Sequence, residues 1–182
     1  MGGNPLIPDE ERVCLELARR AIAHYFKTGG HLRTPIKTGT LKEKRGAFVT
    51  LTVDGELRGC IGYPLPVKLL DETIIKMAVA AASHDTRFAP LLPEEMDRLR
   101  IEISVLGLPV PVTSPMDVEV GRHGIIVSKG SNRGLLLPQV PVEHAWDRET
   151  YLRHGCLKAG LGPDEWRKGA KIEVFTAQVF SE

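Results

Sequence analysis

The chain has 182 residues, and its 24 Lys and Arg residues nearly balance its 23 Asp and Glu residues, for a formal net charge of +1. This balance argues against broad electrostatic binding to nucleic acid. No apolar run reaches the roughly 18 residues that span a bilayer. The three cysteines, an odd number, do not suggest a disulfide framework. We therefore expect a soluble, cytoplasmic protein with reduced thiols, preceded by a flexible N-terminus over residues 1–12 that lacks a signal-peptide core.

The first predicted element is a helix over residues 9–27. Val13, Leu17, Ala21 and Tyr25 recur at helical spacing, and Gly29 and Gly30 stop the helix. Cys14 lies off this apolar stripe and is expected to be inert packing. Residues 32–46 follow as a long basic loop, a kind of segment that is often functional.

A hairpin comes next. The strand-like run 47–53 ends at Asp54-Gly55, the strongest short hairpin signal, and the chain returns through Leu57 to Gly62. Prolines then lead into a helix over residues 67–83.

The second half of the chain continues with shorter elements. We predict a helical piece at 93–98, a strand at 99–106, a stiff linker at Pro109, Pro111 and Pro115, a hairpin of 124–128 with 134–137, a helix at 148–158 capped by Asp147, and a final strand at 171–180. Hairpins with segregated helices favour an α+β fold over a doubly wound sheet.

The segment Arg58-Gly59-Cys60-Ile61-Gly62 is the main candidate site. Side chains two apart in a strand share a face, so Arg58 and Cys60 should point the same way if no bulge intervenes. A guanidinium beside a thiol favours the thiolate, which would make Cys60 a nucleophile or a redox thiol. Gly59 and Gly62 mark a bulge or a close approach by a ligand or another backbone. The alternative, held equal, is that Cys60 is a small buried hydrophobe.

A second candidate is the turn His84-Asp85-Thr86-Arg87. A histidine, a carboxylate and an arginine make an acid–base set, with Asp85 and Arg87 as catalytic candidates and His84 as a ligand-binding one. Against this, adjacent side chains rarely converge. His84 can instead lie at a helix C-terminus, where a cation is favoured, with Arg87 pairing locally.

Two isolated polar residues complete the set. His123 lies in a turn before a hairpin, and Gln139 lies within an apolar run, where it either bonds a loop backbone or binds a ligand. We expect no metal site, because His144 and His154 are ten residues apart and no C-x-x-C pair occurs. The basic stretch 37–45 lacks interleaved aromatic residues and is expected to be a solvated loop rather than a nucleic-acid site.

Five ordered blocks carry a resemblance to a known family. They are Leu57–Gly62, Asp85–Leu91, Gly121–Ile125, Leu136–Val140 and Cys156–Leu161, and together they resemble the AMMECR family, named for a candidate protein of the AMME syndrome. The resemblance implies a prokaryotic-type single-domain member. Its domain would cover 13–182 as two α+β subdomains with a cleft between them: an antiparallel sheet packed by helices, and a smaller lobe that contains a hairpin. The resemblance also suggests Memo-type and radical-SAM proteins as partners.

Three functions remain open from the sequence. The first is a small enzyme or enzyme component in which the Cys60 thiol acts on an anionic substrate held by Arg58 and Arg87. The second is a non-catalytic module that binds a ligand or a partner. The third, nucleic-acid binding, is disfavoured by the near-neutral charge. No cofactor follows from the residues.

Overall fold

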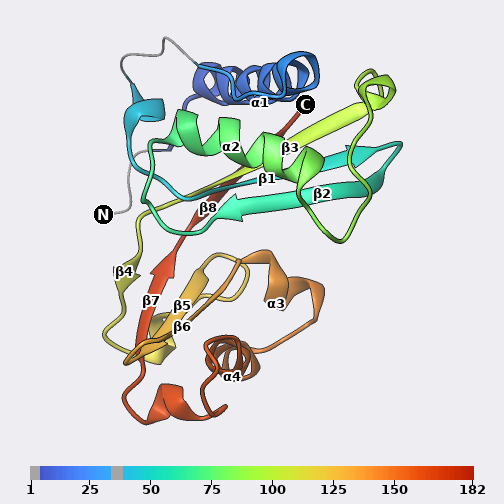
Figure 1. Cartoon of the computed structure of the whole chain (residues 1–182). Helices are drawn as coiled ribbons and strands as arrows, with labels where there is room; N and C mark the ends of the chain where they lie inside the picture. The colour runs from blue at the N-terminus through green and yellow to red at the C-terminus, as the bar shows by residue number, and fades with distance from the viewer. Residues whose placement is uncertain (1–4, 34–38) are drawn as a thin grey trace. The chain divides into compact units, whose positions relative to one another are not determined.

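The computed structural model describes residues 5–33 and 39–182 and confirms the α+β class. In that part of the chain four α-helices accompany two four-stranded sheets (Figure 1). The start of the predicted flexible N-terminus, residues 1–4, and part of the basic loop, residues 34–38, lie outside the described residues. The described chain divides into a larger unit, made of residues 5–106 and Gln178–Glu182, and a smaller unit over Gly107–Ala177. The cleft expected between two subdomains stays a prediction.

The sheet of the larger unit has the strand order β2-β1-β3-β8. Its strands are β1 (Ala47–Val53), β2 (Glu56–Tyr63), β3 (Leu99–Leu106) and β8 (Ala177–Ser181). The predicted hairpin of β1 and β2 is confirmed: Asp54 and Gly55 have φ angles of 53° and 86°, as the two central residues of a type I′ turn require. β2 is therefore an edge strand, with β1 on one side.

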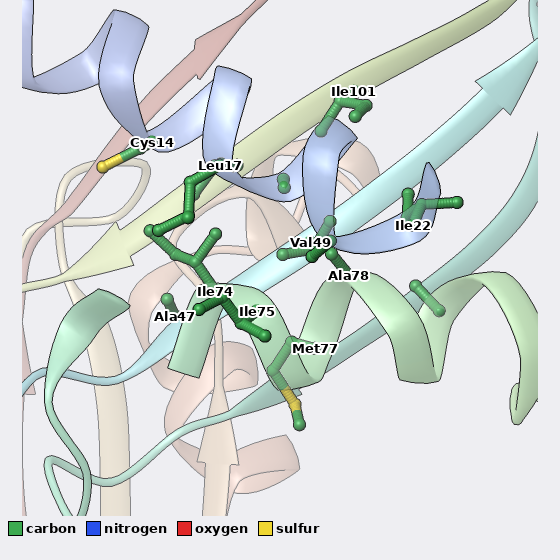
Figure 2. Packing of buried hydrophobic residues seen from close by; sticks show 14 of the residues in the cluster. Cys14, Leu17, Ile22, Ala47, Val49, Ile74, Ile75, Met77, Ala78 and Ile101 are labelled. Carbon is green, nitrogen blue, oxygen red and sulfur yellow. The ribbon is translucent and has the colours of Figure 1, made fainter. Parts of the chain in front are cut away.

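Two helices cover one face of this sheet. α1 (Pro8–Thr28) lies against β3, and α2 (Leu70–Ser83) lies against β1 and β2. The core forms because alternate residues of β1, such as Val49 and Leu51, are buried beneath the helices. Figure 2 shows how the aliphatic side chains of the two helices and of β1 and β3 meet there.

The helix boundaries differ little from the predicted ones. α1 ends where expected, since Gly29 adopts the left-handed conformation with φ 70°. α2 begins at Leu70, three residues later than the predicted start at 67. The placement of Cys14 off the apolar stripe is wrong, because Cys14 is fully buried among the core residues of α1 (Figure 2).

The smaller unit is built around a sheet of order β4-β7-β5-β6. Its strands are β4 (Val110–Pro111), β5 (Gly124–Lys129), β6 (Asn132–Leu136) and β7 (Lys171–Phe175). α4 (Arg148–Lys158) packs on β5 and β6, and its predicted cap is confirmed: the Thr150 N–H donates to Asp147 Oδ1 at 2.8 Å. Fully buried residues such as Tyr151 and Ile125 form the core.

Three predictions for this half of the chain need correction. The single strand expected over 171–180 is two strands, β7 and β8, which belong to different sheets and are separated by Thr176. The stiff linker contains the short strand β4, which pairs with β7. Residues Gln139–Glu143 form a short helix, α3, that the sequence pattern did not reveal.

No helix in the described part of the chain is long and apolar enough to cross a membrane.

Candidate functional site

Cys60 lies on β2 opposite Thr50, on the sheet face away from the two helices. The register pairs Thr50 with Cys60 and Leu51 with Gly59. Because Leu51 is buried beneath α2, its neighbour Thr50 and the paired Cys60 occupy the other face. The Cys60 side chain is half-buried, and the Thr50 hydroxyl donates a hydrogen bond to its Sγ at 3.3 Å. The thiol is thus supplied with a hydrogen-bond donor on this face of the sheet.

A bulge separates Arg58 from Cys60. Leu51 pairs with Gly59 but Thr52 pairs with Leu57, so Arg58 is the extra residue on β2. The condition on which Arg58 and Cys60 were expected to point the same way is therefore not met. Their side chains go to different partners.

Asp85 forms the closest link between the two predicted motifs. Its carboxylate accepts the Cys60 N–H at 2.9 Å and the Arg87 N–H at 3.2 Å. The Arg87 guanidinium donates to both Asp85 oxygens, at 2.9 and 2.6 Å, and to the Cys60 carbonyl at 3.1 Å. The Asp85–Arg87 ion pair thus forms hydrogen bonds with both the N–H and the C=O of Cys60 on the free edge of β2. A neighbouring strand would satisfy the same two groups.

Asp85 and Arg87 each stabilise the charged form of the other. The bidentate bond from Arg87 lowers the pKa of Asp85 far below its ordinary value, and the backbone N–H groups of Cys60 and Arg87 lower it further. The pKa of Arg87 is raised, first by its hydrogen bond to Asp85. The Asp85 side chain is only 4% exposed, whereas that of Arg87 is 57% exposed. Arg87 is therefore the member of the pair that a dissolved molecule can reach.

The Arg58 side chain binds a different set of partners. It donates to the two oxygens of Glu95 at 2.9 and 2.8 Å and to the carbonyl of Ala89 at 2.9 Å. The hydrogen bond from Arg58 lowers the pKa of Glu95, and the same bond raises the pKa of Arg58. Arg58 thereby ties the segment that follows α2 to the bulge of β2. Its predicted contact with an anionic substrate stays a prediction.

The glycines of the motif are close to other parts of this chain. A Cβ at Gly59 would lie 2.1 Å from the backbone oxygen of Ala81 on α2. A Cβ at Gly62 would lie 2.4 Å from the Phe48 ring. Gly59 lets α2 approach β2, and Gly62 leaves room for an aromatic ring. That either glycine also contacts a ligand stays a prediction.

The three remaining candidates occupy separate positions. His84 caps the C-terminus of α2, where its N–H donates to the Ala80 carbonyl and its Nδ1 lies 2.7 Å from Ser83 Oγ. His123 and Gln139 belong to the smaller unit; His123 Nδ1 accepts the Glu119 N–H at 3.1 Å, and Gln139 is exposed at the start of α3. Binding roles for all three stay predictions.

The structure adds two residues that the sequence did not reveal, Thr50 and Glu95. Thr50 contacts the thiol, and Glu95 holds Arg58. Counting back from the Asp54-Gly55 turn without a bulge would place Gly59 opposite Thr50. The one-residue shift at Arg58 brings Cys60 there instead. Within the described residues, no group of three His, Cys, Asp or Glu side chains gathers as a metal site would require.

Comparison with known proteins identifies the family. The AMMECR1 family model matches residues 15–180. Protein MK0488 of Methanopyrus kandleri is 48% identical over 190 residues, covering 99% of this chain and 92% of the relative. A protein of Methanothermobacter thermautotrophicus is 45% identical over 186 residues, covering 98% of this chain and 97% of the relative.

A solved structure agrees with this assignment. The crystal structure of the uncharacterized protein PH0010 from Pyrococcus horikoshii superimposes with a TM-score of 0.81 at 47% identity, over 93% of this chain and 90% of that one. The names of these relatives state no activity, so they give the family and the fold, and the chemistry has to be argued from the site. Because the family model spans residues 15–180 and the archaeal relatives match along nearly the whole chain, the chain belongs to the AMMECR1 family.

Proposed function

We propose that this protein is a small enzyme, or a component of one, in which the Cys60 thiolate attacks a substrate that carries a carboxylate or phosphate. The observation that carries the proposal is the hydrogen bond that the Cys60 sulfur accepts, next to the cation of Arg87. The Thr50 hydroxyl donates to Sγ at 3.3 Å, and the Arg87 guanidinium donates to the backbone carbonyl of the same residue at 3.1 Å. Donors and a cation beside a thiol favour the thiolate, which is the nucleophilic form.

Burial distinguishes Cys60 from the other two thiols. Cys14 and Cys156 are fully buried, whereas Cys60 is half-buried. Burial raises the pKa of Cys14 to about 12 and also raises the pKa of Cys156. A thiol that is both enclosed and protonated is unreactive, so thiol chemistry in this fold belongs to Cys60.

In this proposal each residue of the site has a separate role. The Cys60 sulfur forms a bond to an electrophilic carbon of the substrate, and the leaving group departs with the bonding electron pair and takes a proton from water. Arg87, with an exposed guanidinium, holds the anionic group of the substrate. Asp85 orients Arg87, and Arg58 acts as a positioning residue through Glu95.

Two alkylating reagents test the proposal because they differ in charge. Iodoacetate is an anion and iodoacetamide is neutral; with each, the sulfur bonds to the methylene carbon and iodide leaves with the electron pair. We expect Cys60, located by peptide mass spectrometry, to be the thiol that reacts in the folded protein. The rate ratio of iodoacetate to iodoacetamide should fall about fivefold in Arg87→Gln, since an exposed charge interaction contributes about 1 kcal/mol.

Arg98→Gln is the matched control. Arg98 also pairs with an aspartate, Asp54, and its side chain is 55% exposed, close to the 57% of Arg87. The ratio should not change in this variant. A folded protein in which Cys60 fails to react, or in which Arg87→Gln leaves the ratio unchanged, would contradict the proposal.

A second candidate function, a non-catalytic module that binds a ligand or a partner, is favoured by one observation. Arg58 and Asp85 already form ion pairs within the chain, with Glu95 and Arg87. Two of the four predicted catalytic residues therefore have a structural role. In this alternative the sheet face around Cys60 binds a partner, and Memo-type or radical-SAM proteins are the candidates. Capture of such a partner that persists in Cys60→Ala would favour the module over the enzyme.

A further inference from the structure

A pocket of about 300 Å³ lies beside α2, apart from the thiol. It is lined by His31, which follows α1, by Tyr63 at the end of β2, and by Lys76, Ala80 and His84 on one face of α2. The last three are spaced i, i+4 and i+8 and therefore form a single row along the helix. The volume is at the small end of the range for ligand pockets.

The lining of this pocket carries basic and hydrogen-bonding groups without acidic ones. Lys76 and two histidines face it, and no aspartate or glutamate does. Across residues 5–33 and 39–182, no carboxylate lies within ion-pair distance of Lys76, although Glu72 stands one turn before it. Both undescribed stretches, 1–4 and 34–38, contain no acidic residue either. The Lys76 ammonium thus forms no ion pair with a residue of the described chain.

The rest of the lining is apolar or amphipathic. Met77 and Ala80 supply an apolar wall, and Tyr63 offers a ring and a hydroxyl that makes no hydrogen bond within the described chain. A pocket with a few polar groups on an apolar wall is the usual form of a small-molecule site. The bound molecule would therefore have an anionic group for Lys76 and an apolar body for the helix wall.

We propose that this pocket binds a small organic anion, a phosphate ester or carboxylate with an apolar body, which Lys76 and Tyr63 contact directly. The site is independent of the thiol chemistry. Arg87, which would hold the substrate anion at Cys60, does not line it, and neither does Cys60.

Phenyl phosphate is the probe, because it combines the two features in a small molecule. Titrated into the full chain and followed by calorimetry and by NMR, phenyl phosphate should bind more tightly than inorganic phosphate, and phenol should not bind measurably. Lys76→Gln should weaken phenyl phosphate binding about tenfold, the effect of losing a hydrogen bond to a charged group. Ala80→Phe, which fills the wall of the pocket, should abolish the binding.

The control for the charge is Lys27→Gln. Lys27 is an exposed lysine in the last turn of α1 and does not line the pocket. This variant should bind like the original protein, and thermal unfolding should show that all variants are folded. Equal binding in Lys76→Gln and Lys27→Gln would overturn the proposal. Loss of binding in Arg87→Gln with none in Lys76→Gln would place the ligand at the thiol site and would also overturn it.

Discussion

Asp85 is the residue on which most of the motif contacts converge. A single carboxylate accepts the N–H of Cys60, the N–H of Arg87 and two guanidinium donors. These bonds explain why an aspartate and an arginine two residues apart accompany the cysteine motif of β2. The Asp85–Arg87 pair also satisfies the backbone N–H and C=O of Cys60 on the free edge of β2.

Replacement of Asp85 tests this role. Asp85→Asn should lower the free energy of unfolding at neutral pH by about 1–3 kcal/mol, the range for hydrogen bonds to charged groups. The carboxyl pKa is lower in the folded protein than its ordinary value of 3.8, so its stabilisation is present above about pH 4 and is lost as the pH falls below that. Urea unfolding at pH 7 and pH 3 should show the difference between variant and original shrinking at the lower pH.

Asp54→Asn provides the comparison for Asp85→Asn. Asp54 pairs with Arg98 on the surface, its side chain is 58% exposed, and asparagine tolerates its positive φ angle. The free energy of unfolding of Asp54→Asn should differ from that of the original protein by less than about 0.5 kcal/mol. Equal losses in the two variants would mean that the Asp85 network adds no more than a surface pair.

At the scale of elements, the contact between α2 and β2 depends on Gly59. The backbone oxygen of Ala81 occupies the space that a Cβ would need, and a backbone atom cannot move aside as a flexible side chain can. Gly59→Ala should therefore lower the free energy of unfolding by about 3 kcal/mol, because the helix has to shift. Denaturant unfolding measures the loss.

Gly30→Ala shows whether that effect is specific. Gly30 has no positive φ angle, and a Cβ there would meet only the Thr28 hydroxyl at an ordinary 3.5 Å. Its stability should stay within about 0.5 kcal/mol of the original. If Gly59→Ala were equally harmless, the close packing of α2 on β2 would not be a constraint on the motif.

Some element boundaries follow from local sequence signals, and others depend on pairing with distant strands. The boundaries of β1, β3 and α4 could be predicted because alternation, the Asp54-Gly55 turn and the Asp147 cap are local signals. The split of 171–180 into β7 and β8 could not, because both halves alternate and only pairing with distant strands separates them. The same limit applies at the site. The cysteine and arginine motifs stand out in the sequence, but the bulge at Arg58, which selects Thr50 as the neighbour of Cys60, depends on α2 and on Glu95.

At the scale of the whole molecule, the smaller unit is an insertion between β3 and β8 of the larger one. The two ends of the insertion are adjacent, since the Gly107 N–H donates to the Thr176 carbonyl at 2.8 Å. The last residues close the larger unit: Glu182 forms an ion pair with Arg19 at 2.5 Å and accepts the Ile101 N–H at 3.1 Å. The larger unit is therefore discontinuous in sequence but closed in structure.

This topology predicts that the insertion can be shortened. Replacing residues 108–175 by a short glycine–serine loop should leave the larger unit folded, because its ends already meet and closing a short loop costs little entropy. Hydrogen exchange of β1 and β3 amides, compared with the full chain, measures the outcome. A shortened protein that stops after Ala177, and so lacks β8 and Glu182, should be less protected at β3. Equal protection in both would show that β8 does not stabilise the sheet.

The discontinuity also orders events during translation. A ribosome completes β1, β2 and β3 before it synthesises the smaller unit, and β8 emerges only afterwards. At rates of about 5–20 residues per second, the nascent sheet spends several seconds with β3 as an exposed edge, the kind of strand on which aggregation begins. Arg100 and Glu102 are exposed charges on β3, and charges on an edge strand disfavour pairing with another chain while the nascent chain awaits its last strand.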